Sequence, residues 1–203
     1  MTASVKKSCD NKVSQKYCLL RRGIPKPIHY VLALLLAELN FNELYHLKNE
    51  MKKLSIIGHV PSSNTLKLRK AVLDGAKNIK SGKVHLNCKT PFEADATDTL
   101  SADAIILGTT ENLGYMSGAL KDFFDRTYNE TLEKKEGLPC AIYIRAGMDG
   151  TGTRRAIESI LSGQKWRLVQ PPLIFRGEWN DDFVKQAHEL GEAMCAGLDA
   201  GIF

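Results

Sequence analysis

Four consecutive side chains with hydroxyl or amide groups precede a helical pattern: Ser62, Ser63, Asn64 and Thr65. The free N–H groups and the dipole at a helix N-terminus favour an anion, and small hydroxyl side chains add donors. The same residue types are also the usual N-caps of helices. Because four in a row exceed what one cap needs, the segment predicts a phosphate site in preference to a simple cap.

Two further polar segments are rich in glycine and hydroxyl groups, namely "GTTENLGYMSG" at 108–118 and "RAGMDGTGT" at 145–153. Each of them directly follows an apolar run that is typical of a buried strand. Gly114 would allow a positive φ or a close approach of the backbone to a ligand. A plain turn glycine is the simpler alternative at that position.

Several familiar phosphate-binding patterns are missing from the sequence. No G-x-x-x-x-G-K-[ST] motif occurs, and no G-x-G-x-x-G follows the first apolar run, so a P-loop and a dinucleotide-binding Rossmann domain are disfavoured. A receiver domain would need acidic residues after its first and third strands. Gly58–His59 and Gly108–Thr109 stand there instead, which excludes that class.

The histidines and cysteines give no metal or disulfide pattern. The five histidines lack metal-ligand spacing, so we expect no metal site. The five cysteines include no C-x-x-C pair, and their number is odd. Together with a cysteine inside an apolar run (Cys140), this pattern indicates a reducing compartment, and we expect a cytoplasmic protein.

Strands and helices alternate through the sequence from Met51 onward. Apolar runs predict strands at 53–59, 83–88, 103–110, 138–147 and 167–177. Helical spacing of apolar residues predicts helices at 63–80, 117–130, 153–164 and 181–198. Pro171 and Pro172 interrupt the last of these strands, which suits it to an edge position.

This alternation predicts an α/β fold, a three-layer sandwich around a five-stranded parallel sheet of order 2-1-3-4-5. In such a sheet, ligands bind beyond the carboxyl ends of the strands, where the strand order reverses. The three polar segments all follow strands at that end. We therefore expect them to build one site.

The positive charge is concentrated in the N-terminal quarter. The chain has a net charge of +5, and residues 1–50 hold eight of its 28 basic and four of its 23 acidic residues. The remainder has a charge of only +1, which argues against a nucleic-acid-binding face. We expect residues 1–50 to be a basic and then helical extension, an addition to the native domain at 51–203, with an apolar stretch (28–36) too short to span a bilayer.

The segment "GTTENLGYMSGALKDFFDR" resembles the flavin-binding loop and following helix of the flavodoxin-like NAD(P)H-dependent FMN reductases and quinone reductases. "SSNTLKL" resembles their phosphate loop, and "AGMDGTG" is similar to their third loop. The resemblance covers about residues 52–200. It implies a flavodoxin-like fold, with the three loops in the order that the family has.

The resemblance also implies a site for FMN. The phosphate would bind Ser62, Ser63, Asn64 and Thr65. The isoalloxazine ring would contact two segments: Thr110, Glu111, Asn112, Leu113, Gly114, Tyr115 and Met116, and Ala146, Gly147 and Met148. His59 and Arg145 depart from the family pattern next to these loops.

The resemblance implies an oxidoreductase that takes electrons from NAD(P)H and passes them to a quinone, a flavin or a similar small acceptor. The flavin would do the chemistry, so no side chain is assigned a catalytic role. A homodimer stays open, because enzymes of this fold often bury part of the site between subunits. Two alternatives are a flavodoxin-like electron carrier, which the near-neutral charge disfavours, and a flavodoxin-fold protein without a cofactor.

Overall fold

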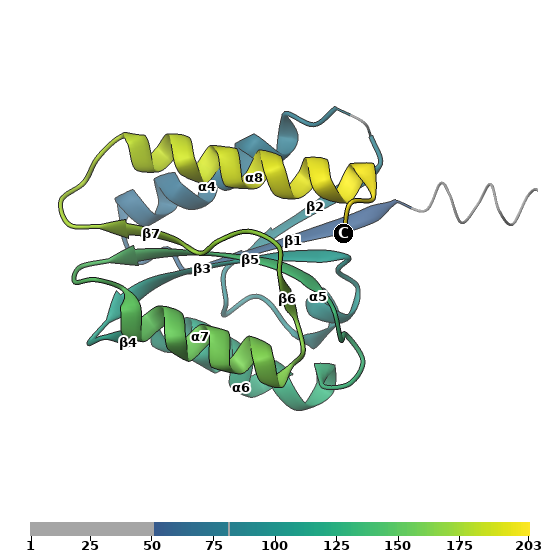
Figure 1. Cartoon of the computed structure of the whole chain (residues 1–203), viewed down its shortest axis with the longest axis horizontal. Coiled ribbons are helices and arrows are strands. Elements are labelled where there is room, and N and C mark those ends of the chain that lie inside the picture. The colour runs from purple at the N-terminus through teal and green to yellow at the C-terminus, as the bar shows by residue number, and fades with distance from the viewer. Residues whose placement is uncertain (1–50, 81) are drawn as a thin grey trace, which may run out of the picture. The chain divides into compact units, whose positions relative to one another are not determined.

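The computed structural model describes residues 51–80 and 82–203, so the predictions for residues 1–50 lie outside the described residues. Parallel strands form a sheet with the order β2-β1-β3-β5-β6 (Figure 1). Their bounds are β1 Lys52–Gly58, β2 Val84–Lys89, β3 Ala104–Asn112, β5 Pro139–Ala146 and β6 Arg167–Leu168. When these five strands are numbered by their place in the sequence, their order across the sheet is 2-1-3-4-5, which confirms the predicted topology.

The predicted fifth strand is two short strands that share one edge of the sheet. β6 pairs with the start of β5, and β7 (Leu173–Arg176) pairs with its end, both in parallel. Pro171 and Pro172 lie between them, and neither has an N–H group to donate to the sheet. The predicted interruption of this strand at the prolines is therefore confirmed, and it divides the hydrogen bonding to β5 between β6 and β7.

Helices cover both faces of this sheet in the described part of the chain. Figure 1 shows α4 (Ser63–Lys77) and α8 (Asp182–Ala200) above it. Below it lie α5 (Ala96–Leu100), α6 (Gly118–Thr131) and α7 (Thr151–Gly163). The three-layer sandwich is thus confirmed, and the missed α5 is too short to show helical periodicity.

Each face of the sheet has its own hydrophobic cluster. Ile105 and Leu107 of β3 pack on the side of α6 and α7, whereas Ala104 and Ile106 pack on the side of α4 and α8. Consecutive strand residues point to opposite faces. Burial on both faces therefore explains why the strands are continuous apolar runs without polar alternation.

The ring of Tyr143 packs over glycines of two adjacent strands, on the face of the sheet that α4 and α8 cover. The aligned positions are Gly58 in β1, Gly108 in β3 and Tyr143 in β5. A Cβ atom on Gly108 would lie 2.0 Å from Cζ of Tyr143, and one on Gly58 would lie 2.5 Å from its hydroxyl oxygen. Burial raises the pKa of Tyr143 above its usual range, so the ring packs here as a neutral side chain.

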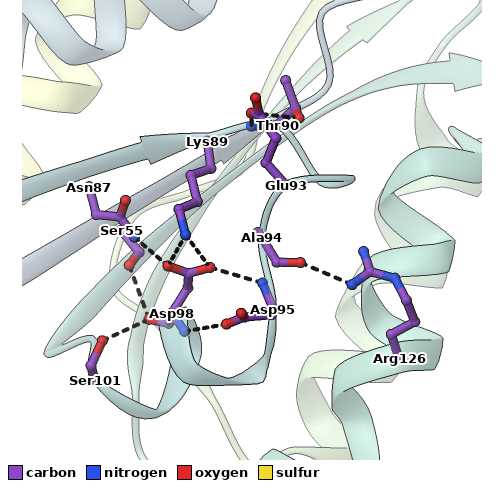
Figure 2. A network of polar contacts seen from close by, with 10 residues as sticks. All are labelled: Ser55, Asn87, Lys89, Thr90, Glu93, Ala94, Asp95, Asp98, Ser101 and Arg126. Atoms are coloured by element: carbon purple, nitrogen blue, oxygen red, sulfur yellow. Dashed lines mark hydrogen bonds and ion pairs between the residues drawn. The ribbon is translucent and has the colours of Figure 1, made fainter.

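Polar contacts fix the segment that follows β2 (Figure 2). Asp98, in the first turn of α5, completes the capping box of that helix with the N-cap Asp95, and it accepts hydrogen bonds from Lys89 at 2.7 Å and from Asn87 at 2.8 Å. Burial opposes ionisation of Asp98, but these bonds outweigh it and lower the pKa of the carboxyl group. Arg126 of α6 donates to the carbonyl oxygens of Ala94 and Pro91. The segment therefore has a defined position beside the carboxyl end of β2.

The packing of Tyr143 leads to a stability prediction. Gly108→Ala places a methyl group against the ring, so we expect the free energy of unfolding to fall by about 1–3 kcal/mol in urea titrations. Gly118→Ala is the matched control, because no described atom lies within 4 Å of its added Cβ and its φ is not positive. An equal effect of the two substitutions would contradict this account of the glycine.

Candidate functional site

The three polar segments start at the same edge of the sheet, at the left in Figure 1. Gly58 of β1 is in register with Gly108 of β3, and the N–H of His59 donates to the carbonyl of Gly108 at 2.9 Å. The chain order reverses at β1, which lies between β2 and β3. The site therefore occupies the position where ligands bind in open α/β sheets.

The predicted phosphate segment forms the start of α4. Ser62 is its N-cap, and its hydroxyl accepts from the N–H of Thr65 at 3.3 Å. The hydroxyl of Thr65 in turn accepts from the N–H of Ser62 at 3.0 Å. Ser62 and Thr65 thus form a capping box, which satisfies both of these N–H groups.

The other two residues of the segment keep free donors. The N–H groups of Ser63 and Asn64 have no hydrogen-bond partner within the described residues. The side chain of Ser63 is exposed and that of Asn64 is half-buried. These two N–H groups, with the dipole of a 15-residue helix behind them, are the donors of the segment that are free to bind an anion.

The segment at 110–116 is a β-hairpin instead of the expected open loop. β3 continues to Asn112, and β4 (Tyr115–Met116) pairs with it antiparallel. Leu113 and Gly114 make the two-residue turn, with φ angles of 53° and 75°. Positive φ at both turn residues is what a type I′ hairpin requires. Two paired residues are too few for a strand pattern to show in the sequence.

A pair of buried hydroxyl groups closes the base of this hairpin. The hydroxyl of Thr109 donates to that of Ser117 at 3.0 Å and accepts from the N–H of Ser117 at 3.1 Å. Ser117 also caps α6, because its hydroxyl accepts from the N–H of Leu120. Sequence reasoning missed both hydroxyls, although a serine directly before a helix is an N-cap signal.

The hairpin is bound to the segment after β5 through Glu111. Its carboxylate accepts from the N–H of Met148 at 2.7 Å and from the N–H of Gly150 at 3.1 Å. Gly150 is the N-cap of α7 and has no side chain of its own to accept a hydrogen bond, while the Asp149 carboxylate accepts from the N–H of Thr151 at 2.8 Å. The Glu111 carboxylate therefore lies at a helix N-terminus, where negative charge is favoured.

The predicted ring-binding residues divide into a buried and an exposed group. Met116 and Ala146 are buried in the cluster that faces α6 and α7. Leu113 is fully exposed, Met148 is 73% exposed and Tyr115 is 42% exposed. The remaining members of the two segments are half-buried or exposed, namely Thr110, Glu111, Asn112, Gly114 and Gly147. The structure thus places segments 110–116 and 146–148 next to each other. Their exposed side chains Leu113, Tyr115 and Met148 form an apolar rim.

The two departures from the family pattern do not add charge to this rim. Arg145 donates to the carbonyl oxygens of Phe175 and Gly177 and lies over the ring of Phe183, on the side of α8. His59 lies edge-on to Phe92, and burial lowers the pKa of its imidazole, so His59 is neutral at pH 7. Arg126 of α6 also contributes no charge to the rim, because it binds the segment after β2.

Residues 51–80 and 82–203 contain neither a metal-binding cluster nor a membrane-spanning helix. No group of three or more His, Cys, Asp or Glu side chains lies close enough to hold a metal ion there. Within the same residues, no helix has both the length and the apolar character to cross a membrane.

Comparison with known proteins establishes the fold class. No family model matches the sequence. A flavodoxin from Aquifex aeolicus (strain VF5) is 30% identical over 112 residues, which cover 55% of this chain and 60% of the relative. The match thus spans less than two thirds of the relative's length.

Solved structures give the same result with wider coverage. A flavodoxin from the domain Archaea superposes with a TM-score of 0.63 at 17% identity, over 72% of this chain and 98% of that chain. The flavodiiron protein from Giardia intestinalis superposes with a TM-score of 0.64 at 16% identity, over 83% of this chain and 41% of that chain. For the WrbA-like protein from Agrobacterium tumefaciens the TM-score is 0.56 at 15% identity, over 72% of this chain and 96% of that chain. The chain therefore has a flavodoxin-like fold.

The hairpin turn leads to a second prediction. Leu113→Asn creates an Asn-Gly turn, and asparagine tolerates positive φ better than leucine does. We expect the free energy of unfolding to rise by about 1 kcal/mol. Leu113→Ala is the control, because alanine keeps the backbone penalty and the exposed leucine side chain has little packing to lose. Equal stability of the two variants would show that Leu113 is not strained.

Proposed function

We propose that residues 51–203 bind FMN and act as an NAD(P)H-dependent flavin or quinone oxidoreductase. The observation that carries the proposal is the meeting of an anion site and an apolar rim at one edge of the sheet. The anion site consists of the free N–H groups of Ser63 and Asn64. The rim consists of the hairpin and the segment after β5, which are joined to each other through Glu111.

These features fit the two ends of FMN. The phosphate would bind the N–H groups at the start of α4, with the Ser63 hydroxyl and the Asn64 amide as additional donors. The capping box keeps that end of the helix in place without using those donors. The planar ring would lie against the rim, where exposed Leu113, Tyr115 and Met148 offer apolar contact.

Bound FMN would supply the chemistry, by accepting a hydride from NAD(P)H and passing the electrons to a second substrate. The chain's own residues would bind and orient it. Because side chains of the rim are exposed, we infer that a small planar acceptor, a quinone or a flavin, could reach the ring. No nucleic acid is proposed as a partner, since the charge of residues 51–203 is close to neutral.

An electron carrier is the second candidate, since the Aquifex aeolicus relative and several similar structures are flavodoxins. A carrier would dock on protein partners and would not turn over NAD(P)H. Strong net charge steers such docking, and residues 51–203 carry only +1. That charge favours the enzyme over the carrier.

The first test of the function is spectroscopic and kinetic. We expect the protein to bind one FMN per chain, with perturbed flavin absorption bands, and to oxidise NADH or NADPH in the presence of quinones or free FMN. Flavin binding without NAD(P)H oxidation by any acceptor would support the carrier. The absence of binding on FMN titration would contradict both redox functions and favour a cofactor-free protein.

A substitution at the start of α4 tests the phosphate site. Proline is tolerated at the first helical position, and the extended conformation of Ser62 (φ −145°, ψ 165°) suits a residue before proline. Ser63→Pro therefore removes one N–H donor and keeps the helix. We expect its affinity for FMN to fall about tenfold, for a charged hydrogen bond of about 1.5 kcal/mol.

Riboflavin is the control ligand for this test, because it has the ring and lacks the phosphate. Its affinity should be the same in the wild type and in Ser63→Pro. Ser63→Ala separates the backbone donor from the hydroxyl group. An equal loss of FMN and riboflavin binding in Ser63→Pro would place the phosphate elsewhere.

A further inference from the structure

Glu111 bridges the two segments that would contact the flavin ring. It lies on the hairpin, and both of its carboxylate oxygens accept N–H groups from the segment after β5. Hydrogen bonds to an ionised acceptor are stronger than those between neutral groups. These two bonds are the direct polar link between the hairpin and that segment within the described residues.

A close backbone contact supports the same junction. Gly152, in the first turn of α7, lies against the hairpin turn, and a Cβ atom on it would be 2.2 Å from the carbonyl oxygen of Gly114. The absence of a side chain at Gly152 therefore lets the turn rest directly on the helix. The hairpin meets α7 at two points, one held by the Glu111 carboxylate and one by the Gly114–Gly152 contact.

Resting on the FMN site proposed above, we propose that Glu111 is a positioning residue that sets the spacing of the ring-binding segments and makes a bound flavin harder to reduce. The spacing follows from the two hydrogen bonds. The effect on reduction follows from charge, because reduction adds electron density to the ring and a nearby carboxylate opposes it.

The Glu111 carboxylate makes no ion pair within the described residues, and its hydrogen-bond partners are neutral N–H groups. Arg145, opposite Thr110, turns toward Phe175 and Gly177, and Arg176 of β7 interacts with the neighbouring carboxylate of Asp149. The dipole of α7 offsets part of the negative charge. The rest of the negative charge of Glu111 acts on a ligand that lies over the rim.

Three variants separate spacing from charge. Glu111→Gln removes the charge and keeps the length of the side chain. Glu111→Ala removes both the charge and the bridge. Gly152→Ala keeps the charge and displaces the hairpin turn, since its methyl group cannot fit beside the carbonyl of Gly114. Glu130→Gln is the matched control, an exposed glutamate near the end of α6.

The readouts are the dissociation constants of FMN and riboflavin, the midpoint potential of bound FMN and the hydrogen exchange of the Met148 and Gly150 amides. For Glu111→Ala and Gly152→Ala we expect both ligands to bind about tenfold more weakly, in contrast to Ser63→Pro, which affects FMN alone. In Glu111→Gln the affinity for reduced relative to oxidised FMN should rise about tenfold, equal to about 30 mV for two electrons. Gly152→Ala should leave that ratio unchanged.

The exchange measurement separates this inference from the proposed function. The amides of Met148 and Gly150 should exchange faster in Glu111→Ala and at the wild-type rate in Glu130→Gln. If the wild type binds no flavin, the proposed function fails, and unchanged exchange in Glu111→Ala would overturn the bridge as well. If flavin binds, equal affinities and potentials in the wild type and both Glu111 variants would overturn the inference.

Discussion

The parallel pairing of β1, β3 and β5 is the constraint on which the rest of this structure depends. It aligns Gly58, Gly108 and Tyr143 across the sheet, and the aromatic ring passes over both glycines. With the strands held in this register, the segments after all three of them emerge at one edge. A shift of one residue would turn the apolar side chains of a strand to the wrong face, and both hydrophobic clusters would lose their packing.

The site is built on this edge by local polar contacts that occupy some donors and leave others free. At α4 the capping box uses Ser62 and Thr65 and leaves the N–H groups of Ser63 and Asn64 available. At the hairpin, buried hydroxyls fix the base, the Glu111 carboxylate joins the hairpin to the segment after β5, and the turn rests on Gly152 of α7. The rigid parts of the site are thus buried, and the parts that would meet a ligand are exposed.

Much of this arrangement could be predicted from the sequence because its signals are local. Uninterrupted apolar runs marked the buried strands, glycine and hydroxyl residues marked the loops, and alternation of strands and helices gave the strand order. The interruption of the fifth strand at Pro171 and Pro172 could also be predicted, since proline cannot donate to a sheet. The short hairpin strand β4 and the helix α5 were missed because neither is long enough for a period to show.

The contacts between distant segments could not be predicted. Glu111 was expected to contact a ring, but nothing in the sequence indicates that its carboxylate reaches the N–H groups of Met148 and Gly150, 37 and 39 residues away. Likewise, the direction of the Arg145 side chain depends on β7 and α8, which follow it in the chain. Such contacts depend on tertiary packing, which residue type and spacing do not determine.

We propose that one edge of the sheet holds a flavin by its phosphate and its ring. A titration with FMN, followed by amide chemical shifts, locates the bound flavin. We expect saturable shifts that are largest at Ser63 and Asn64 and at residues 110–116 and 146–148. Saturable shifts elsewhere, such as along the groove between α4 and α8 lined by Ala71, Val184 and His188, or no shifts at all, would contradict it.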